Sequence, residues 1–210
     1  MKNIEGLVED AVELAQQGHT KGEIADELNV SRETATWLVS RSEVGTAPAT
    51  GPNQPHDIHV DWSALGRDST RLYHAGAAMA DLLSKRGTDV DLTVGIEKAG
   101  APLATTVARE LDTDLATYAP RKHQWDEEGD LDNVEGSFSR NFADIRDREC
   151  YVVDDIVTSG TTMTETVEAV VDAGGEPVAC VVIVDKQGIE EIEGVPVYSL
   201  LRVVRVGENG

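Results

Sequence analysis

The sequence predicts an α/β domain with a mostly parallel sheet, preceded by a small all-α domain. From about His56 onward, apolar strand-like runs alternate with helix-like segments, as in parallel sheets covered by helices. The first 43 residues instead show only helical periodicity. Residues 44–55 are uncharged and rich in Gly, Pro and Thr, which is typical of a linker. We therefore expect domains at residues 1–43 and 56–210.

The N-terminal region is predicted to contain three short helices. An apolar stripe over residues 4–15 predicts the first helix, and Gly18 is a plausible end for it. A second helix ends near Asn29, which tolerates the left-handed conformation of a tight turn. Ser31 is a suitable N-cap for the third helix, over residues 31–42.

The spacing of Ala25, Asn29 and Ala35 resembles the helix-turn-helix DNA-binding motif. The resemblance implies that helix 31–42 is a recognition helix and that a homodimer reads a palindromic operator in double-stranded DNA. The residues expected to face base edges are Arg32, Glu33, Thr36 and Trp37. Those expected near phosphates are Lys21, Ser31, Thr34 and Arg41. The alternative is a three-helix module that binds another protein.

The charge of this region is unusual for a DNA-binding domain. Residues 1–43 hold four basic and nine acidic side chains, a net charge of −5, which is the wrong sign for a phosphate binder. The whole chain shares the bias, with a net charge of −21. Such composition resembles that of proteins from salt-loving archaea, where the Debye length at about 1 M salt is only about 3 Å. An acidic mesophilic protein is the alternative.

The α/β region is predicted element by element. A long helix is expected at residues 68–86, with further helices at 101–111 and 161–173. Strands are expected at residues 90–96, 115–118, 150–155, 178–185 and 197–200.

The stretch 150–162 indicates a ribose-phosphate site. Asp154 and Asp155 end a buried strand, and the small residues of 158–162 lead into a helix. In open α/β sheets, ligands bind outside the carboxyl ends of strands. A helix start offers N–H groups to a phosphate, and carboxylates accept hydrogen bonds from sugar hydroxyls.

This stretch resembles the phosphoribosyl-diphosphate (PRPP) signature of type I phosphoribosyltransferases. The resemblance implies that Asp154 and Asp155 hold the ribose hydroxyls. It also implies a 5′-phosphate cradle made of Thr158, Ser159, Gly160, Thr161 and Thr162. The alternative is an ordinary strand–turn–helix junction in which Asp and Thr serve as caps.

A second stretch, residues 91–104, resembles the pyrophosphate loop of orotate phosphoribosyltransferases. Gly100 permits close approach of a ligand to the backbone, and Pro102 suits a first helical turn. The resemblance adds Glu97, Lys98 and Gly100 to the expected ligand-binding residues.

The stretch after residue 118 resembles the start of the catalytic loop of these enzymes, and then departs from it. Arg121 and Lys122 match, and we expect them to contact the ligand. Trp125 and Glu127 stand where the enzymes carry Lys and His. Residues 120–135 hold two basic and six acidic side chains, a net charge of −4, which would repel a departing pyrophosphate. We therefore assign no catalytic residue.

As a whole, the chain resembles orotate phosphoribosyltransferase-like transcriptional regulators of salt-loving archaea, which implies control of glucose and fructose breakdown. We expect a DNA-binding regulator whose second domain senses a phosphorylated effector and forms the dimer. DNA binding should need no cofactor, although Mg²⁺ would accompany a PRPP-like ligand. Two alternatives stay open: an active orotate phosphoribosyltransferase, and a purine phosphoribosyltransferase or salvage regulator.

The remaining composition excludes several other classes. Cys150 and Cys180 lie in expected central strands and are predicted to be buried thiols. The five His lack metal-ligand spacing, so no metal site is expected. Without a signal peptide or an apolar run of about 18 residues, we expect a cytoplasmic protein that does not enter a membrane.

Overall fold

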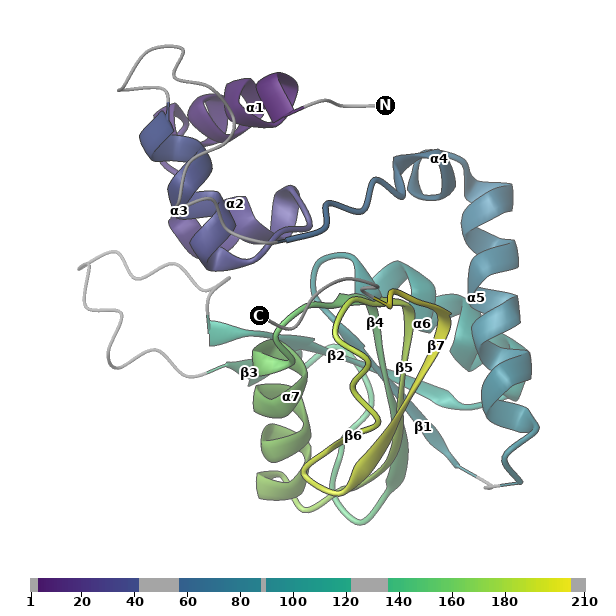
Figure 1. Ribbon diagram of the computed structural model, residues 1–210. Helices are drawn as coiled ribbons and strands as arrows, with labels where there is room; N and C mark the ends of the chain where they lie inside the picture. Colours follow the sequence, from purple (N-terminus) through teal and green to yellow (C-terminus); the bar gives the residue numbers. More distant parts are fainter. Residues whose placement is uncertain (1–3, 42–56, 88–89, 122–135, 205–210) are drawn as a thin grey trace. The chain divides into compact units, whose positions relative to one another are not determined.

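The computed structural model describes residues 4–41, 57–87, 90–121 and 136–204 (Figure 1). The chain divides into two compact units, Met1–Ala64 and Leu65–Gly210. The linker predicted at residues 44–55 lies outside the described residues.

The first unit contains the three predicted helices, α1 (Ile4–Gln16), α2 (Lys21–Glu27) and α3 (Arg32–Arg41). Their inward faces form one core, which consists of Leu7, Ala11, Ile24, Ala25, Leu28, Val30, Ala35 and Leu38. The turn between α2 and α3 contains Asn29 with φ +52°, the left-handed conformation expected from the sequence.

The second unit is built on a seven-stranded sheet with the order β3-β2-β1-β4-β5-β7-β6. Its strands are β1 (Leu92–Ile96), β2 (Asp114–Ala119), β3 (Ser137–Phe138), β4 (Glu149–Val157), β5 (Glu176–Asp185), β6 (Glu191–Ile192) and β7 (Val195–Arg202). The five central strands are parallel, whereas β3 and β6 pair antiparallel at the edges. The predicted α/β class and all five predicted strands are confirmed.

Helices cover both faces of this sheet (Figure 1). Helices α5 (Ser69–Ser84) and α6 (Gly100–Leu111) pack on one face, and α7 (Thr161–Asp172) packs on the other. A short helix, α4 (Ser63–Gly66), precedes α5. From β1 the chain crosses through α6 to β2 on one side, and from β4 it crosses through α7 to β5 on the other. Because crossovers are right-handed, these opposite directions place α6 and α7 on opposite faces, and the sheet reverses direction between β1 and β4.

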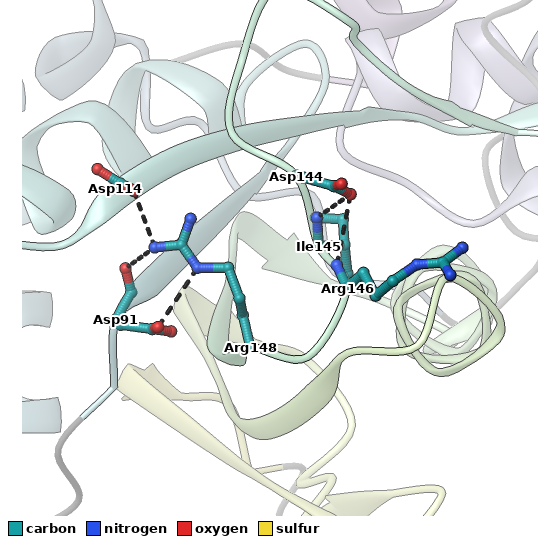
Figure 2. A network of polar contacts seen from close by, with 6 residues as sticks. All are labelled: Asp91, Asp114, Asp144, Ile145, Arg146 and Arg148. Carbon is teal, nitrogen blue, oxygen red and sulfur yellow. Dashed lines mark hydrogen bonds and ion pairs between the residues drawn. The ribbon is translucent and has the colours of Figure 1, made fainter.

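An arginine clamp joins the amino ends of three neighbouring strands, β2, β1 and β4 (Figure 2). Arg148 Nη2 donates to the Asp91 carbonyl oxygen at 2.7 Å and to Asp114 Oδ2 at 2.8 Å. Arg148 Nε lies 3.4 Å from Asp91 Oδ2. Because Asp91 precedes β1, Asp114 begins β2 and Arg148 precedes β4, the clamp stabilises the edge opposite to the predicted ligand site.

Both cysteines are free and fully buried, as predicted. Cys150 lies in β4 and Cys180 in β5. Burial raises the pKa of the Cys150 thiol from 9.0 to about 12, and burial also raises the pKa of the Cys180 thiol.

Candidate functional site

The carboxyl ends of β1 and β4 lie side by side, because these strands pair in parallel. The loop after β1 contains Glu97 and Lys98, and the loop after β4 contains Thr158 and Ser159. This is the point at which the sheet reverses direction, where open α/β sheets bind their ligands. The structure therefore brings the two predicted ligand loops to one place.

Gly100 brings the pyrophosphate-type loop against the end of β4. A Cβ atom at Gly100 would lie 2.9 Å from Asp154 Cα and 3.1 Å from Asp154 Oδ1. Such distances are closer than side-chain atoms tolerate, so only glycine allows this approach. The start of α6 consequently lies directly beside the two carboxylates.

The carboxylates Asp154 and Asp155 are half-buried at the end of β4. The Asp155 N–H donates to Asp154 Oδ1 at 2.9 Å, which orients the first carboxylate. Carboxylates that remain partly accessible at this edge can accept hydrogen bonds from the hydroxyls of a sugar.

The loop after these carboxylates forms the start of α7. Gly160 has φ +83° and precedes the helix without a side-chain cap, and the first turn contains no acidic residue. The Ser159 Oγ and Thr161 Oγ1 atoms lie 3.0 Å apart, so two hydroxyls gather at the same point. Thr162 follows in the first turn and is half-buried. A helix start with no acidic side chain of its own suits an anionic group such as a phosphate.

The loop after β1 places its two charged residues differently. Glu97 is half-buried, and its Oε1 accepts a hydrogen bond from Thr117 Oγ1 at 2.9 Å. Lys98 is exposed, and the peptide bond between Glu97 and Lys98 is cis. Glu97 is therefore oriented by β2, whereas Lys98 is accessible from solvent.

Arg121, at the root of the catalytic-type loop, is exposed and held by a residue that the sequence did not indicate. The Arg121 N–H donates to Glu165 Oε1 at 2.8 Å, and Tyr118 OH donates to the same oxygen at 3.0 Å. Glu165 belongs to α7, 44 residues further along the chain, so no local pattern could identify this contact. Lys122 lies outside the described residues, as do the Trp125 and Glu127 substitutions.

Two consecutive charged residues at the carboxyl end of β5, Asp185 and Lys186, were not among the predicted site residues. Asp185 and Lys186 are both buried, with exposed fractions of 0% and 3%. Asp185 Oδ1 accepts hydrogen bonds from the Gln187 and Gly188 N–H groups at 2.9 and 2.8 Å. The signal was present, because an apolar run that ends in charged residues is the same pattern that identified Asp154.

No group of three or more His, Cys, Asp or Glu side chains gathers into a metal site within the described ranges.

Among the described helices, none combines the length and apolar character required to cross a membrane.

Helix α3, the predicted recognition helix, exposes its expected base-reading residues to different extents. Arg32 and Glu33 are exposed, whereas Thr36 and Trp37 are half-buried. A Cβ atom at Gly22 would lie 3.2 Å from Arg32 Nη2, so the guanidinium lies across the start of α2. The absence of a side chain at Gly22 provides the space for it.

Ser31 and Thr34 are engaged with each other at the start of α3. The Thr34 N–H donates to Ser31 Oγ at 3.1 Å, and the two hydroxyl oxygens lie 2.9 Å apart. Thr34 is also buried, with an exposed fraction of 8%. Ser31 is therefore the N-cap of α3, as predicted, and the Thr34 hydroxyl lies beside it at the helix start.

The basic residues around α3 lie at its two ends and on α2. Lys21 is exposed at the start of α2. Arg41 is half-buried in the last turn of α3, with its guanidinium carbon 4.9 Å from the centre of the Trp37 ring. This cation–π contact and the packing of Trp37 on the core fix the end of the helix.

Comparison with protein families places the second unit in a known group. The model of the phosphoribosyl transferase domain matches residues 61–202. Proteins named Transcriptional regulator GfcR are similar over the full chain. That of Haloarcula marismortui is 71% identical, covering 100% of this chain and 99% of the relative. The relative from Haloferax volcanii is 61% identical, with 100% of both chains covered, and that from Methanocella arvoryzae is 44% identical, with 98% and 100% covered.

Solved structures show the same fold. Orotate phosphoribosyltransferase from Mycobacterium tuberculosis, in complex with PRPP, is 19% identical with a TM-score of 0.55, covering 74% of this chain and 86% of its own. The orotate phosphoribosyltransferase from Aeropyrum pernix is 22% identical with a TM-score of 0.54, covering 73% and 84%. At these identities the likeness concerns the fold.

Proposed function

Because the chain belongs to the phosphoribosyl transferase domain family and to the family of transcriptional regulators named GfcR, we propose that its second unit senses a phosphorylated small molecule and thereby controls DNA binding by the first unit. Family membership makes the chain a transcriptional regulator and favours this function over an orotate phosphoribosyltransferase. We also propose the class of ligand, the symmetry of the operator and the oligomeric state of the protein.

One observation carries the sensor role: the close approach of Gly100, at the start of α6, to Asp154, near the carboxyl end of β4. It puts two carboxylates, two hydroxyls and an uncapped helix start within one site. This set matches a ribose that carries a phosphate, as in PRPP or a nucleotide. The charge of the loop at residues 120–135 disfavours turnover, because an acidic loop does not stabilise departing pyrophosphate.

Helix α3 is proposed to be the recognition helix, which contacts the bases of the operator. Arg32 is the candidate for a bidentate contact with guanine, while Glu33, Thr36 and Trp37 complete the face. The residues proposed to contact phosphates are Lys21, Ser31, Thr34 and Arg41. A homodimer formed by the second unit would present two such helices to a palindromic operator, with half-sites about 34 Å apart. The regulated genes are proposed to serve glucose and fructose breakdown, and the protein is proposed to act in the cytoplasm, where the DNA is.

We expect Mg²⁺ to bind at this site together with the phosphorylated ligand. Proteins commonly hold Mg²⁺ by one or two carboxylates and by phosphate oxygens of the ligand. Asp154 and Asp155 are consecutive carboxylates in this site, and within the described residues they belong to no group of three or more His, Cys, Asp or Glu side chains. These two residues would hold the ion, which would neutralise charge on the bound ligand.

Isothermal calorimetry with PRPP, in molar KCl with Mg²⁺, tests the sensor. We expect the wild-type protein to bind and the double variant Asp154→Asn, Asp155→Asn to lose binding, because amides neither hold Mg²⁺ as well nor accept as strongly. Asp172→Asn, an exposed change at the far end of α7, should bind like the wild type. Equal binding by the double variant would remove the carboxylates from the site, and absence of wild-type binding would exclude PRPP as effector.

The retained phosphate loop also leaves a second candidate, an active orotate phosphoribosyltransferase. Turnover of orotate with PRPP and Mg²⁺ in molar salt decides between the two. We expect none above the rate of the double variant, whereas turnover abolished by that variant would establish an enzyme.

A further inference from the structure

The two helices of the helix-turn-helix begin with different caps. In α2, Thr20 and Glu23 satisfy each other's backbone N–H groups, at 2.7 and 3.3 Å. In α3, Ser31 Oγ accepts from the Thr34 N–H, which is only the first half of such a box. The second half normally requires Glu or Gln three residues after the cap, and Thr34 occupies that position.

A residue outside the motif supplies the missing half. Asp57 Oδ2 accepts a hydrogen bond from the Ser31 N–H at 2.5 Å, although Asp57 lies 26 residues further along the chain. Asp57 Oδ1 accepts from the Ile58 N–H at 2.7 Å, which fixes the orientation of the carboxylate. The start of α3 is thus capped by the segment that follows the predicted linker.

The same segment makes two more contacts with the turn between α2 and α3. Asn29 Nδ2 donates to the Val60 carbonyl oxygen at 3.1 Å. His59 Nδ1 lies 2.6 Å from the Leu28 carbonyl oxygen and donates to it. Because a carbonyl oxygen can only accept, the proton of this hydrogen bond lies on Nδ1 of His59.

We propose that residues 57–60, here termed the strap, position the recognition helix for sequence-specific DNA binding, with Asp57 as the principal positioning residue. The strap contacts Leu28, Asn29 and Ser31, which all lie in the turn between α2 and α3. All of these contacts lie within the first unit, Met1–Ala64. The inference rests on the proposed function, since it assigns residues that the motif alone does not contain.

Three variants distinguish positioning of the recognition helix from effects on folding or on net charge. Asp57→Ala removes the cap, whereas Asp57→Asn keeps an oxygen that can accept from the Ser31 N–H. Asn29→Gly removes the amide contact with Val60 and keeps the turn, because glycine adopts the φ of +52° readily. Glu9→Ala, an exposed position on α1, is the control for loss of one negative charge.

The test measures full-length protein in molar KCl against two DNA duplexes. One is the sequence that the wild type selects from random double-stranded DNA, and the other is a scrambled version of it. The readout is the ratio of the two affinities. We expect Asp57→Ala to lower this ratio about fivefold, the scale of one lost helix cap, and Asn29→Gly to lower it about two- to threefold. Asp57→Asn and Glu9→Ala should stay within about twofold of the wild type.

Each other outcome overturns the proposal. A parallel loss of both affinities, with an unchanged ratio, would make the strap a folding element only. Tighter binding by both Asp57 variants would show that the carboxylate merely repels DNA. If Asp57→Ala fails to fold, an unchanged ratio in Asn29→Gly is decisive against the strap. A wild type that prefers neither duplex refutes the proposed function itself, whereas a discriminating wild type with equally discriminating variants refutes only the strap.

Discussion

At position 32, the proposed recognition helix α3 presents an exposed side chain whose guanidinium lies over Gly22 on α2. If Arg32 forms a bidentate contact with guanine, Arg32→Ala should weaken specific binding by about 1–3 kcal/mol. Fluorescence anisotropy with labelled operator DNA in molar KCl measures the change. Arg71→Ala is the matched control, because Arg71 is exposed on α5 and pairs with Asp68. Equal losses in the two variants would argue against a base contact by Arg32.

The buried thiols predict a particular alkaline response. The pKa of Cys150 is raised to about 12 by burial, and burial raises that of Cys180 in the same direction. A thiol whose pKa is raised in the folded state favours folding below its unfolded pKa, 9.0, and this advantage is lost as the pH rises toward the folded value. The free energy of unfolding should therefore fall between pH 9 and pH 12. Urea unfolding should show a shallower decline in the double variant Cys150→Ala, Cys180→Ala; identical slopes would contradict the assignment.

At the residue scale, local patterns predicted the caps and the carboxylates but not their distant partners. Asp154 was identifiable because two consecutive acidic residues at the end of a buried apolar run are costly without a ligand role. Glu165 and Asp57 were not, because their contacts span 44 and 26 residues and depend on how the chain returns in space. The contact between the Thr34 and Ser31 hydroxyls is another example, because spacing alone does not reveal it.

At the level of elements, helix α6 makes two close contacts that depend on glycine, one with α5 at Gly76 and one with β4 at Gly100. Substitutions at these two glycines should distinguish an effect on stability from an effect on ligand binding. A Cβ atom at Gly76 on α5 would lie 2.6 Å from Thr106 Cβ, much as one at Gly100 would meet Asp154. Gly76→Ala and Gly100→Ala should each lower the free energy of unfolding by about 1–3 kcal/mol, the usual cost of overpacking. Only Gly100→Ala should also abolish binding of PRPP, because only it displaces the loop from Asp154. Thermal unfolding and calorimetry provide the two readouts; equal ligand affinities in the two variants would contradict the site.

The elements that could be predicted are those with enough residues to show a pattern. Strands β1, β4 and β5 are covered by helices on both faces and so appear as continuous apolar runs. Strands β3 and β6 contain two residues each, too few for any periodicity, and they exist only because a neighbouring edge is available for pairing. Helix α4, with four residues, was missed for the same reason.

For the whole molecule, the net charge of −21 predicts dependence on salt. Repulsion among acidic side chains opposes the compact state, and at about 1 M salt a Debye length of about 3 Å screens it. We expect the midpoint of thermal unfolding to rise steadily from dilute buffer to molar KCl. Sucrose at equal osmolality should give a smaller rise, because it does not screen charge. Full native circular dichroism and an unchanged midpoint in dilute buffer would contradict this expectation.

In the proposed function, the phosphoribosyltransferase-type ligand site of the second unit controls DNA binding by helix α3 of the first unit. Genome-wide DNA occupancy, measured in cells grown with and without glucose, tests it with the natural effector present. We predict discrete wild-type peaks at promoters of sugar breakdown that change with glucose and disappear in Arg32→Ala. The double variant Asp154→Asn, Asp155→Asn should keep its peaks but lose their response to glucose. A double variant that responds like the wild type would contradict the claim.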